Sequence, residues 1–242
     1  EGCASIADQN GDILFYTDGM LVYNKNHTVM PNGSGMLGSS SSSQSGIIIK
    51  QPGSTNIYYI FSVDGVSGNN GGLHYSELNM TLDGGLGDLT INKNINLIPN
   101  TCEKITACQH QNGYDYWIIS RVENSNTYHA YLLTSSGINL TPVVTNIGPL
   151  HDNTWGYLKA SPNGNRLVAA NSCSASCLGA NSIDIFDFDK NSGLLSNVRV
   201  IYPTANRRPY GVEFSQNNNL LYISFSVQSS PADIFQYDLI AG

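Results

Sequence analysis

The chain has 242 residues, only 12% of them charged, and a formal net charge of −7. This balance leaves no basic stripe to replace counterions around phosphates, which argues against nucleic-acid partners and against binding to an anionic membrane surface. No apolar run approaches the roughly 20 residues that a membrane-spanning helix needs, so no membrane insertion is predicted.

The composition is typical of an all-β protein. Gly, Asn and Ser are abundant, and the chain holds 14 Tyr against 11 Lys and Arg together. β-branched and aromatic residues form short clusters between Gly, Asn, Ser and Pro corners, which predicts many short strands joined by turns.

A recurring corner divides the chain into five similar units. The corners lie at Gly11, Gly53, Gly113, Gly164 and Asn218. A short strand is expected before each corner, in the segments CASIA, SGIIIK, KITACQ, GYLKAS and YGVEFS. A more apolar strand is expected after it, in DILFYT, IYYIFSV, YDYWIIS, RLVAAN and LLYISFS. A third strand of alternating character follows in every unit, and a fourth is expected in the second, third and fourth units, in INKNINLI, NLTPVVTNIG and LSNVRVIY.

Such a repeat predicts a β-propeller of four-stranded antiparallel blades in a single domain. About five blades are visible, at residues 1–37, 44–98, 102–148, 156–201 and 209–242, and Ser-rich residues 38–43 are interpreted as a flexible linker. We expect these blades to belong to a larger, six- to seven-bladed propeller in a longer chain. The alternative is a β-sandwich with coincidental hairpins, which has no reason to repeat at this period.

The five cysteines are an odd number. Cys173 and Cys177 lie in the small-residue loop SCSASCLG, which could close a disulfide; the alternative is that both are small buried side chains. Cys102 and Cys108 are separated by a predicted strand that would hold their Cα atoms about 20 Å apart, whereas a disulfide tolerates about 7 Å. Cys3 has no evident local partner.

Three charged residues interrupt inner strands that are otherwise apolar: Lys104, Lys159 and Glu213. Lys159 and Glu213 have the same register when the fourth and fifth units are aligned on their corners. With His151 and Arg208, which lie near the ends of inner strands, they are candidates for a ligand-binding channel mouth. The alternative is that they form an ion pair or a solvated channel lining.

Motifs of catalysis and of cofactor binding are absent from the sequence. It has no nucleophile elbow, no His-Glu-x-x-His and no phosphate-binding Gly-rich loop, so no catalytic residue is assigned. Asp187, Asp189 and Asn191 alternate like the start of a calcium loop, but the glutamate that such a loop requires is missing. We therefore predict neither a metal nor another cofactor, with calcium as the weaker alternative.

Several stretches resemble a known family: EGCASIADQNGDILFYTDGMLVYNKNHTVMPNGSGMLG, QPGSTNIYYIFSVD, DYWIISR, AYLLTSSGINLTPVV, GYLKASPNGNRLVAA and RPYGVEFSQNNNLLYIS. They look like the N-terminal propeller-like region of large secreted surface proteins of Bacteroidetes, of the gliding-motility-associated type that uses type IX secretion. The stretch SPNGNRLVAAN…IDIFDFDKNSGLL is more distantly similar to seven-bladed lactonase-like propellers. The first resemblance implies an exported protein, at the cell surface or outside the cell, and no particular reaction.

The function expected from these observations is a non-enzymatic module for adhesion, for binding a glycan or protein partner, or for scaffolding beside other domains of the same chain. The alternative is a lactonase- or lyase-like enzyme that uses Lys159, Glu213 and His151 at the channel mouth. A purely structural role in a repeating surface assembly is a third possibility.

Overall fold

The computed structural model describes residues 2–65, 71–152, 154–173, 181–204, 207–227 and 233–241. In these residues the chain is almost entirely β-structure, without an α-helix and with one 3₁₀ turn, η1 (Asp83–Gly85). None of the described segments is a helix with the length and apolarity to cross a membrane. The chain forms two compact units, residues 1–103 with 134–137 and residues 104–133 with 138–242.

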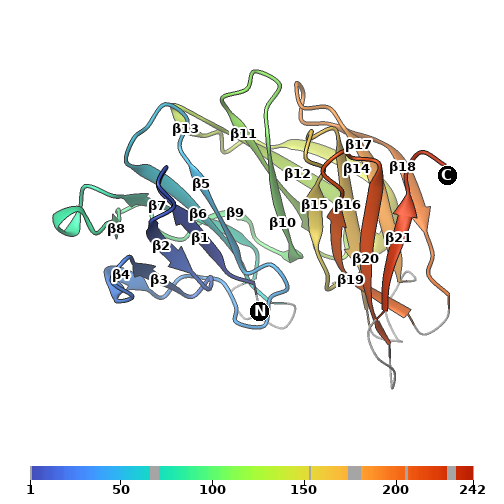
Figure 1. The fold of residues 1–242 in the computed structure, drawn as a ribbon, viewed down its shortest axis with the longest axis horizontal. Helices are drawn as coiled ribbons and strands as arrows, with labels where there is room; N and C mark the ends of the chain where they lie inside the picture. Colours follow the sequence, from blue (N-terminus) through green and yellow to red (C-terminus); the bar gives the residue numbers. More distant parts are fainter. Residues whose placement is uncertain are drawn as a thin grey trace. The chain divides into compact units, whose positions relative to one another are not determined.

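The first unit contains two antiparallel sheets (Figure 1). One has the order β1 (Ala4–Ala7), β2 (Ile13–Thr17), β3 (Leu21–Asn24), β4 (Val29–Ser34). The other consists of β5 (Gly46–Lys50), β6 (Ile57–Val63), β7 (Leu73–Asn79) and β8 (Asp88–Leu89), with β9 (Ile95–Ile98) also paired to β7. Buried side chains of both sheets form one core, which includes Phe15, Val22, Tyr58 and Ile60.

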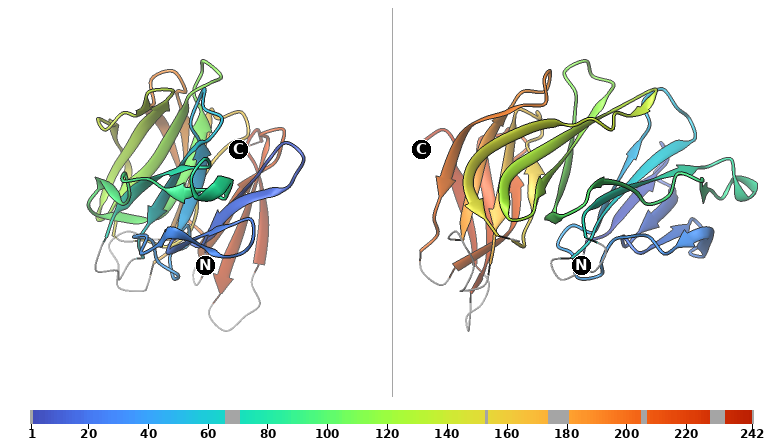
Figure 2. Two further views of the ribbon diagram at one scale, coloured as in Figure 1. Left: turned by 90° about the vertical axis from the view of Figure 1, so that its left-hand side faces the viewer. Right: turned by 180° about the vertical axis from the view of Figure 1, so that it is seen from behind.

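The second unit contains three sheets, which Figure 2 shows from two further directions. The first is β10 (Thr101–Gln109), β11 (Tyr116–Val122), β12 (Ser125–Thr134) and β13 (Gly137–Ile138), with β14 (Val143–His151) paired to β12. The second is β15 (Leu158–Ala160), β16 (Arg166–Asn171), β17 (Ser182–Phe188) and β18 (Leu195–Ile201). The third is β19 (Arg207–Phe214), β20 (Leu220–Val227) and β21 (Asp233–Asp238).

Strand β16 explains why the second strand of a unit is continuously apolar. Leu167 and Ala169 belong to the core shared with the preceding sheet. Val168 and Ala170 belong to the core shared with the following sheet. Successive side chains of a strand point to opposite faces, so a strand between two sheets needs apolar residues at every position. The expected burial between blades is confirmed here.

The repeated corners share one turn geometry. The backbone N–H of Gly11, Gly113, Gly164 and Asn218 donates to the carbonyl three residues earlier, at 2.8–3.1 Å. All four residues have a positive φ, between 63° and 90°. Glycine adopts this region readily, and asparagine is among the few other residues that tolerate it. The remaining corner, at Gly53, also has a positive φ. Its turn hydrogen bond is shifted by one residue, because the Ser54 N–H donates to the Gln51 carbonyl at 3.1 Å.

Two expectations about the first unit were wrong. Residues 29–34 form the fourth strand β4, although Pro31, Asn32 and Gly33 gave no strand signal. The Ser-rich segment does connect the two sheets, but it is not a loose linker. Ser42, Ser43 and Ser45 are buried, and the Ser43 backbone N–H and hydroxyl both donate to Glu103 Oε2 at 2.8 Å. Small hydroxyl side chains suit such a packed, hydrogen-bonded segment as well as they suit a linker.

The described cysteines lie in three different environments. Cys102 and Cys108 are reduced thiols buried on the same strand, β10, and Cys3 is a reduced thiol that is exposed. Cys173 is disulfide-bonded. Cys177, its predicted partner, lies outside the described residues.

Candidate functional site

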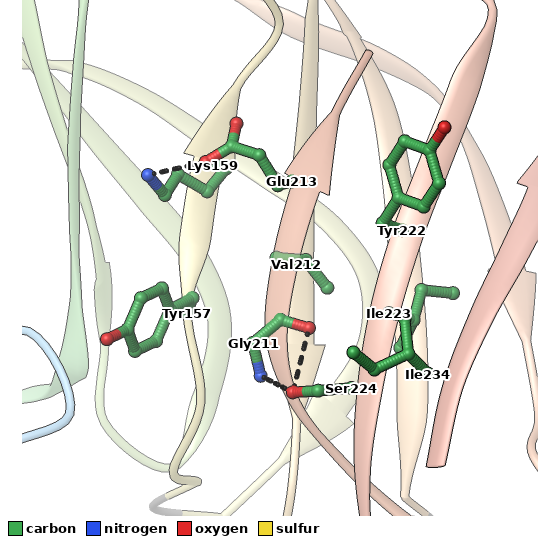
Figure 3. A pocket seen from close by; sticks show the side chains of 9 residues that line it. All are labelled: Tyr157, Lys159, Gly211, Val212, Glu213, Tyr222, Ile223, Ser224 and Ile234. Atoms are coloured by element: carbon green, nitrogen blue, oxygen red, sulfur yellow. Dashed lines mark hydrogen bonds and ion pairs between the residues drawn. The ribbon is translucent and has the colours of Figure 1, made fainter.

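A pocket of about 290 Å³ lies on β15, β19, β20 and β21 of the second unit (Figure 3). Lys159 and Glu213 meet at its edge, with Lys159 Nζ 2.9 Å from Glu213 Oε2. Their side chains are 34% and 58% exposed. The shared register in the sequence therefore brings the two charges together, and they neutralise each other in a position open to solvent.

Aromatic and apolar side chains line the rest of this pocket. Tyr157, directly before β15, and Tyr222 on β20 lie on either side of β19. Ile234 on β21 also lines the pocket and is exposed. The backbone holds the floor in place, because the Tyr157 N–H donates to the Tyr210 carbonyl at 2.9 Å and so joins the two sheets. The Gly211 N–H donates to Ser224 Oγ at 2.8 Å.

Lys104 does not line this pocket. Its side chain is fully buried, and Nζ donates to the carbonyl oxygens of Thr154, Trp155 and Gly156 at 3.1, 2.6 and 2.9 Å. A buried ammonium requires such partners, because an unpaired charge in the interior is very costly. Lys104 therefore fixes the segment that leads into β15.

His151 also belongs to a buried network. Its Nε2 lies 3.0 Å from Asp184 Oδ2, and both side chains are 2% exposed. Ser182 Oγ lies 3.3 Å from the same nitrogen and donates to Asp184 Oδ1 at 2.7 Å. Asn171 Nδ2 donates to Asp184 Oδ2 at 2.9 Å. A serine-hydrolase triad places the serine and the carboxylate on different ring nitrogens, whereas one nitrogen faces both here, so this is not a nucleophile–base arrangement.

Arg208 lies on β19, half-buried, and is not among the residues that line the pocket. The five residues predicted to form a channel mouth are thus divided in the structure. Lys159 and Glu213 pair at the pocket, whereas Lys104 and His151 are each enclosed in contacts of their own.

Sequence reasoning missed the residues that complete these sites. Tyr157 and Tyr222 gave no signal beyond the general abundance of tyrosine. Arg121 is fully buried on β11, where one guanidinium nitrogen donates to Asp152 O and to Thr154 Oγ1, both at 2.9 Å. The signal available in the sequence was a charged residue inside an apolar strand, the same signal that made Lys104 a candidate for the channel mouth.

The calcium-like stretch uses its carboxylates locally. Asp187 accepts from Asn197 Nδ2 at 2.9 Å. Asp189 accepts from the Ser192 hydroxyl and from the Asn191 N–H, and these hydrogen bonds, the one from Ser192 above all, hold its pKa below the usual value. Within the described ranges, no three His, Cys, Asp or Glu side chains come together as metal ligands.

No protein-family model matches the chain, and no curated protein matches it in sequence. Solved structures do match it. A candidate TolB from Agrobacterium tumefaciens is similar over 99% of this chain and 77% of its own, with a TM-score of 0.51 and 13% identity. Candidate 6-phosphogluconolactonases from Bacteroides uniformis and Bacteroides fragilis each have a TM-score of 0.46 and 13% identity. They cover 99% and 97% of this chain and 78% and 83% of their own.

The likeness to the TolB structure shows the fold. The chain is a β-propeller built from four-stranded antiparallel blades. At this level of identity the likeness carries no activity or ligand with it.

Proposed function

We propose that the protein is a non-enzymatic binding module whose ligand is a glycan held at the pocket of Lys159, Glu213, Tyr157 and Tyr222. The observation that carries this proposal is the ion pair itself. Two solvent-accessible charges at equal register satisfy each other at 2.9 Å and leave a polar but neutral edge beside two tyrosine rings.

This chemistry suits a sugar. An ammonium group donates hydrogen bonds and a carboxylate accepts them, so the adjacent Lys159 and Glu213 can hydrogen-bond to neighbouring hydroxyl groups of one sugar ring. Aromatic rings provide flat apolar surfaces with a polar tip, which pack against the C–H face of a sugar. A strongly charged ligand would instead have to compete with one member of the ion pair.

The enzymatic alternative, of the lactonase or lyase type, rests on the more distant sequence resemblance, and no arrangement of side chains among the described residues supports it. Catalysis at a channel mouth requires acid, base and electrophilic groups that converge on a space for the substrate. Lys159 and Glu213 are engaged with each other, and His151 is buried against Asp184.

We also propose that the module is exported, at the cell surface or outside the cell, where it serves adhesion or scaffolding. This rests on the resemblance of the sequence to secreted surface proteins. The disulfide at Cys173 is compatible with it, since disulfides persist in oxidising compartments.

Glycan-array binding followed by calorimetry on the best ligand tests the binding proposal. Tyr222→Ala should weaken that ligand about three- to tenfold, the loss expected for one aromatic contact. Tyr114→Ala, which removes a 77% exposed tyrosine outside the pocket, is the matched control and should leave the affinity unchanged. Absence of binding across plant, algal and host glycans, or equal losses in both variants, would exclude the pocket as a glycan site.

A further inference from the structure

A second cavity, of about 630 Å³, lies in the first unit. It opens beside the corners that follow β1 and β5, and β2, β6 and the segment after β7 complete its wall. The lining residues on which the argument depends are Asp8, Gln9, Lys50, Asn56, Tyr58 and Met80. Its volume is within the range of small-ligand sites in proteins, roughly 300–1,000 Å³.

Opposite charges line this cavity without meeting. The positions of Asp8 and Lys50 in the two corners differ by one residue. Asp8 accepts the turn hydrogen bond of the first corner from Gly11, whereas Gln51, which follows Lys50, accepts that of the next corner from Ser54. At the other pocket, Lys159 and Glu213 have equal register and are in contact. No ion pair joins Asp8 to Lys50, and in the described part of the chain neither side chain has another ionic partner.

The two charged groups are differently held. Asp8 Oδ1 accepts the backbone N–H groups of Asn10 and Asp12 at 2.8 and 3.0 Å, which fixes the carboxylate. Lys50 Nζ lies 5.7 Å from the centroid of the Tyr58 ring. The cavity therefore offers a preorganised anion on one wall and a cation over an aromatic ring on another.

The remaining lining combines apolar groups with amides. Ile6, Leu14 and Met80 are half-buried and Tyr58 is buried, so they form an apolar floor. Gln9 and Asn56 expose side-chain amides, whose donors and acceptors match those of a peptide bond.

We propose that this cavity binds a short peptide with free ends. The peptide carboxylate pairs with Lys50 and its ammonium group with Asp8, the apolar side chains contact the floor, and the peptide bond faces the amides of Gln9 and Asn56. A neutral sugar would leave both charges without a counter-charge, and a phosphate-bearing ligand would be repelled by Asp8. The dipeptide leucyl-leucine has the required apolar body and both terminal charges.

Titration of the full chain with leucyl-leucine, followed by NMR chemical shifts or calorimetry, tests this inference. N-acetyl-leucyl-leucine lacks the ammonium group, and leucyl-leucine amide lacks the carboxylate. Each should bind about three- to fivefold more weakly than the free dipeptide, the effect of one exposed ion pair. Maltose serves as the neutral probe and should not bind at this cavity.

Charge-removing variants test which residue binds each end of the peptide. Asp8→Asn keeps the acceptor for the turn and removes only the charge, so it should weaken leucyl-leucine about three- to fivefold but leave the N-acetyl form unchanged. Lys50→Gln should weaken the dipeptide equally and leave the amide form unchanged. The controls are Asp12→Asn and Lys25→Gln, which remove exposed charges outside the lining.

Equal binding of all three peptides, binding of maltose at the cavity, or indifference to both Asp8→Asn and Lys50→Gln would overturn the proposal. These outcomes are distinct from failure of the glycan pocket, because the two experiments change no residue in common.

Discussion

Replacing Lys104 by methionine should destabilise the second unit strongly. The variant keeps a long unbranched side chain but removes the ammonium that three carbonyl oxygens accept from at 2.6–3.1 Å. The Trp155 carbonyl keeps the Ser172 N–H as a donor at 3.1 Å. The Thr154 and Gly156 carbonyls each lose a buried hydrogen bond to a charged donor, which contributes about 1.5–3 kcal/mol. At the lower end of that range, the free energy of unfolding falls by about 3 kcal/mol.

Urea unfolding followed by tryptophan fluorescence measures this loss. Both tryptophans of the chain, Trp117 and Trp155, are in the second unit, so the signal reports on the affected region. With a urea slope of about 3 kcal/mol per molar, the midpoint should decrease by roughly 1 M. Lys159→Met is the matched control, because its ion pair is open to solvent and should contribute at most about 1 kcal/mol. A loss in Lys104→Met no larger than in the control would refute the anchoring role of Lys104.

Three further predictions concern thiols, pH and the corner turn. A maleimide at pH 8 should label Cys3 in the folded protein but reach Cys102 and Cys108 only after unfolding, since both are buried and burial raises the pKa of Cys108 to about 12. Peptide mass spectrometry identifies the labelled sites. Labelling of Cys108 in the folded protein would contradict its burial. Burial lowers the pKa of His129, so the unfolded chain binds the proton first, and stability should fall as the pH decreases below about 6.5. His129→Gln should flatten that decrease between pH 7.5 and 5.5 in urea titrations, and an unchanged slope would show that other groups cause it. Gly164→Ala should lower the free energy of unfolding by about 1–2 kcal/mol, because residue 164 has a positive φ that alanine adopts poorly. Gly164→Asn should lower it less, since asparagine tolerates this region. Equal thermal midpoints of the two variants would refute the turn argument.

How far the site could be predicted depended on whether a residue interrupts its local pattern. Lys159 and Glu213 are charged residues in apolar inner strands, and alignment on the corners was enough to place them opposite each other. Lys104 interrupted its strand in the same way, but its carbonyl partners come from a segment 50 residues later, which no local pattern identifies. Tyr222 follows the ordinary alternation of a strand, so only its 39% exposure in the folded protein distinguishes it from a core residue.

The sequence by itself determined the repeat, because its signals are local. A turn that requires a positive φ selects Gly or Asn at each corner, and burial on both faces selects an uninterrupted apolar strand after it. Only the tertiary structure decided the roles of the residues that depart from this repeat. Ser43 was interpreted as part of a flexible linker until its contacts with Glu103 were known. Two pairs of opposite charge show the same dependence, since Lys159 and Glu213 are in contact whereas Asp8 and Lys50 line one cavity without forming an ion pair. The distance between side chains on neighbouring sheets depends on how those sheets pack, and a one-dimensional register does not contain it.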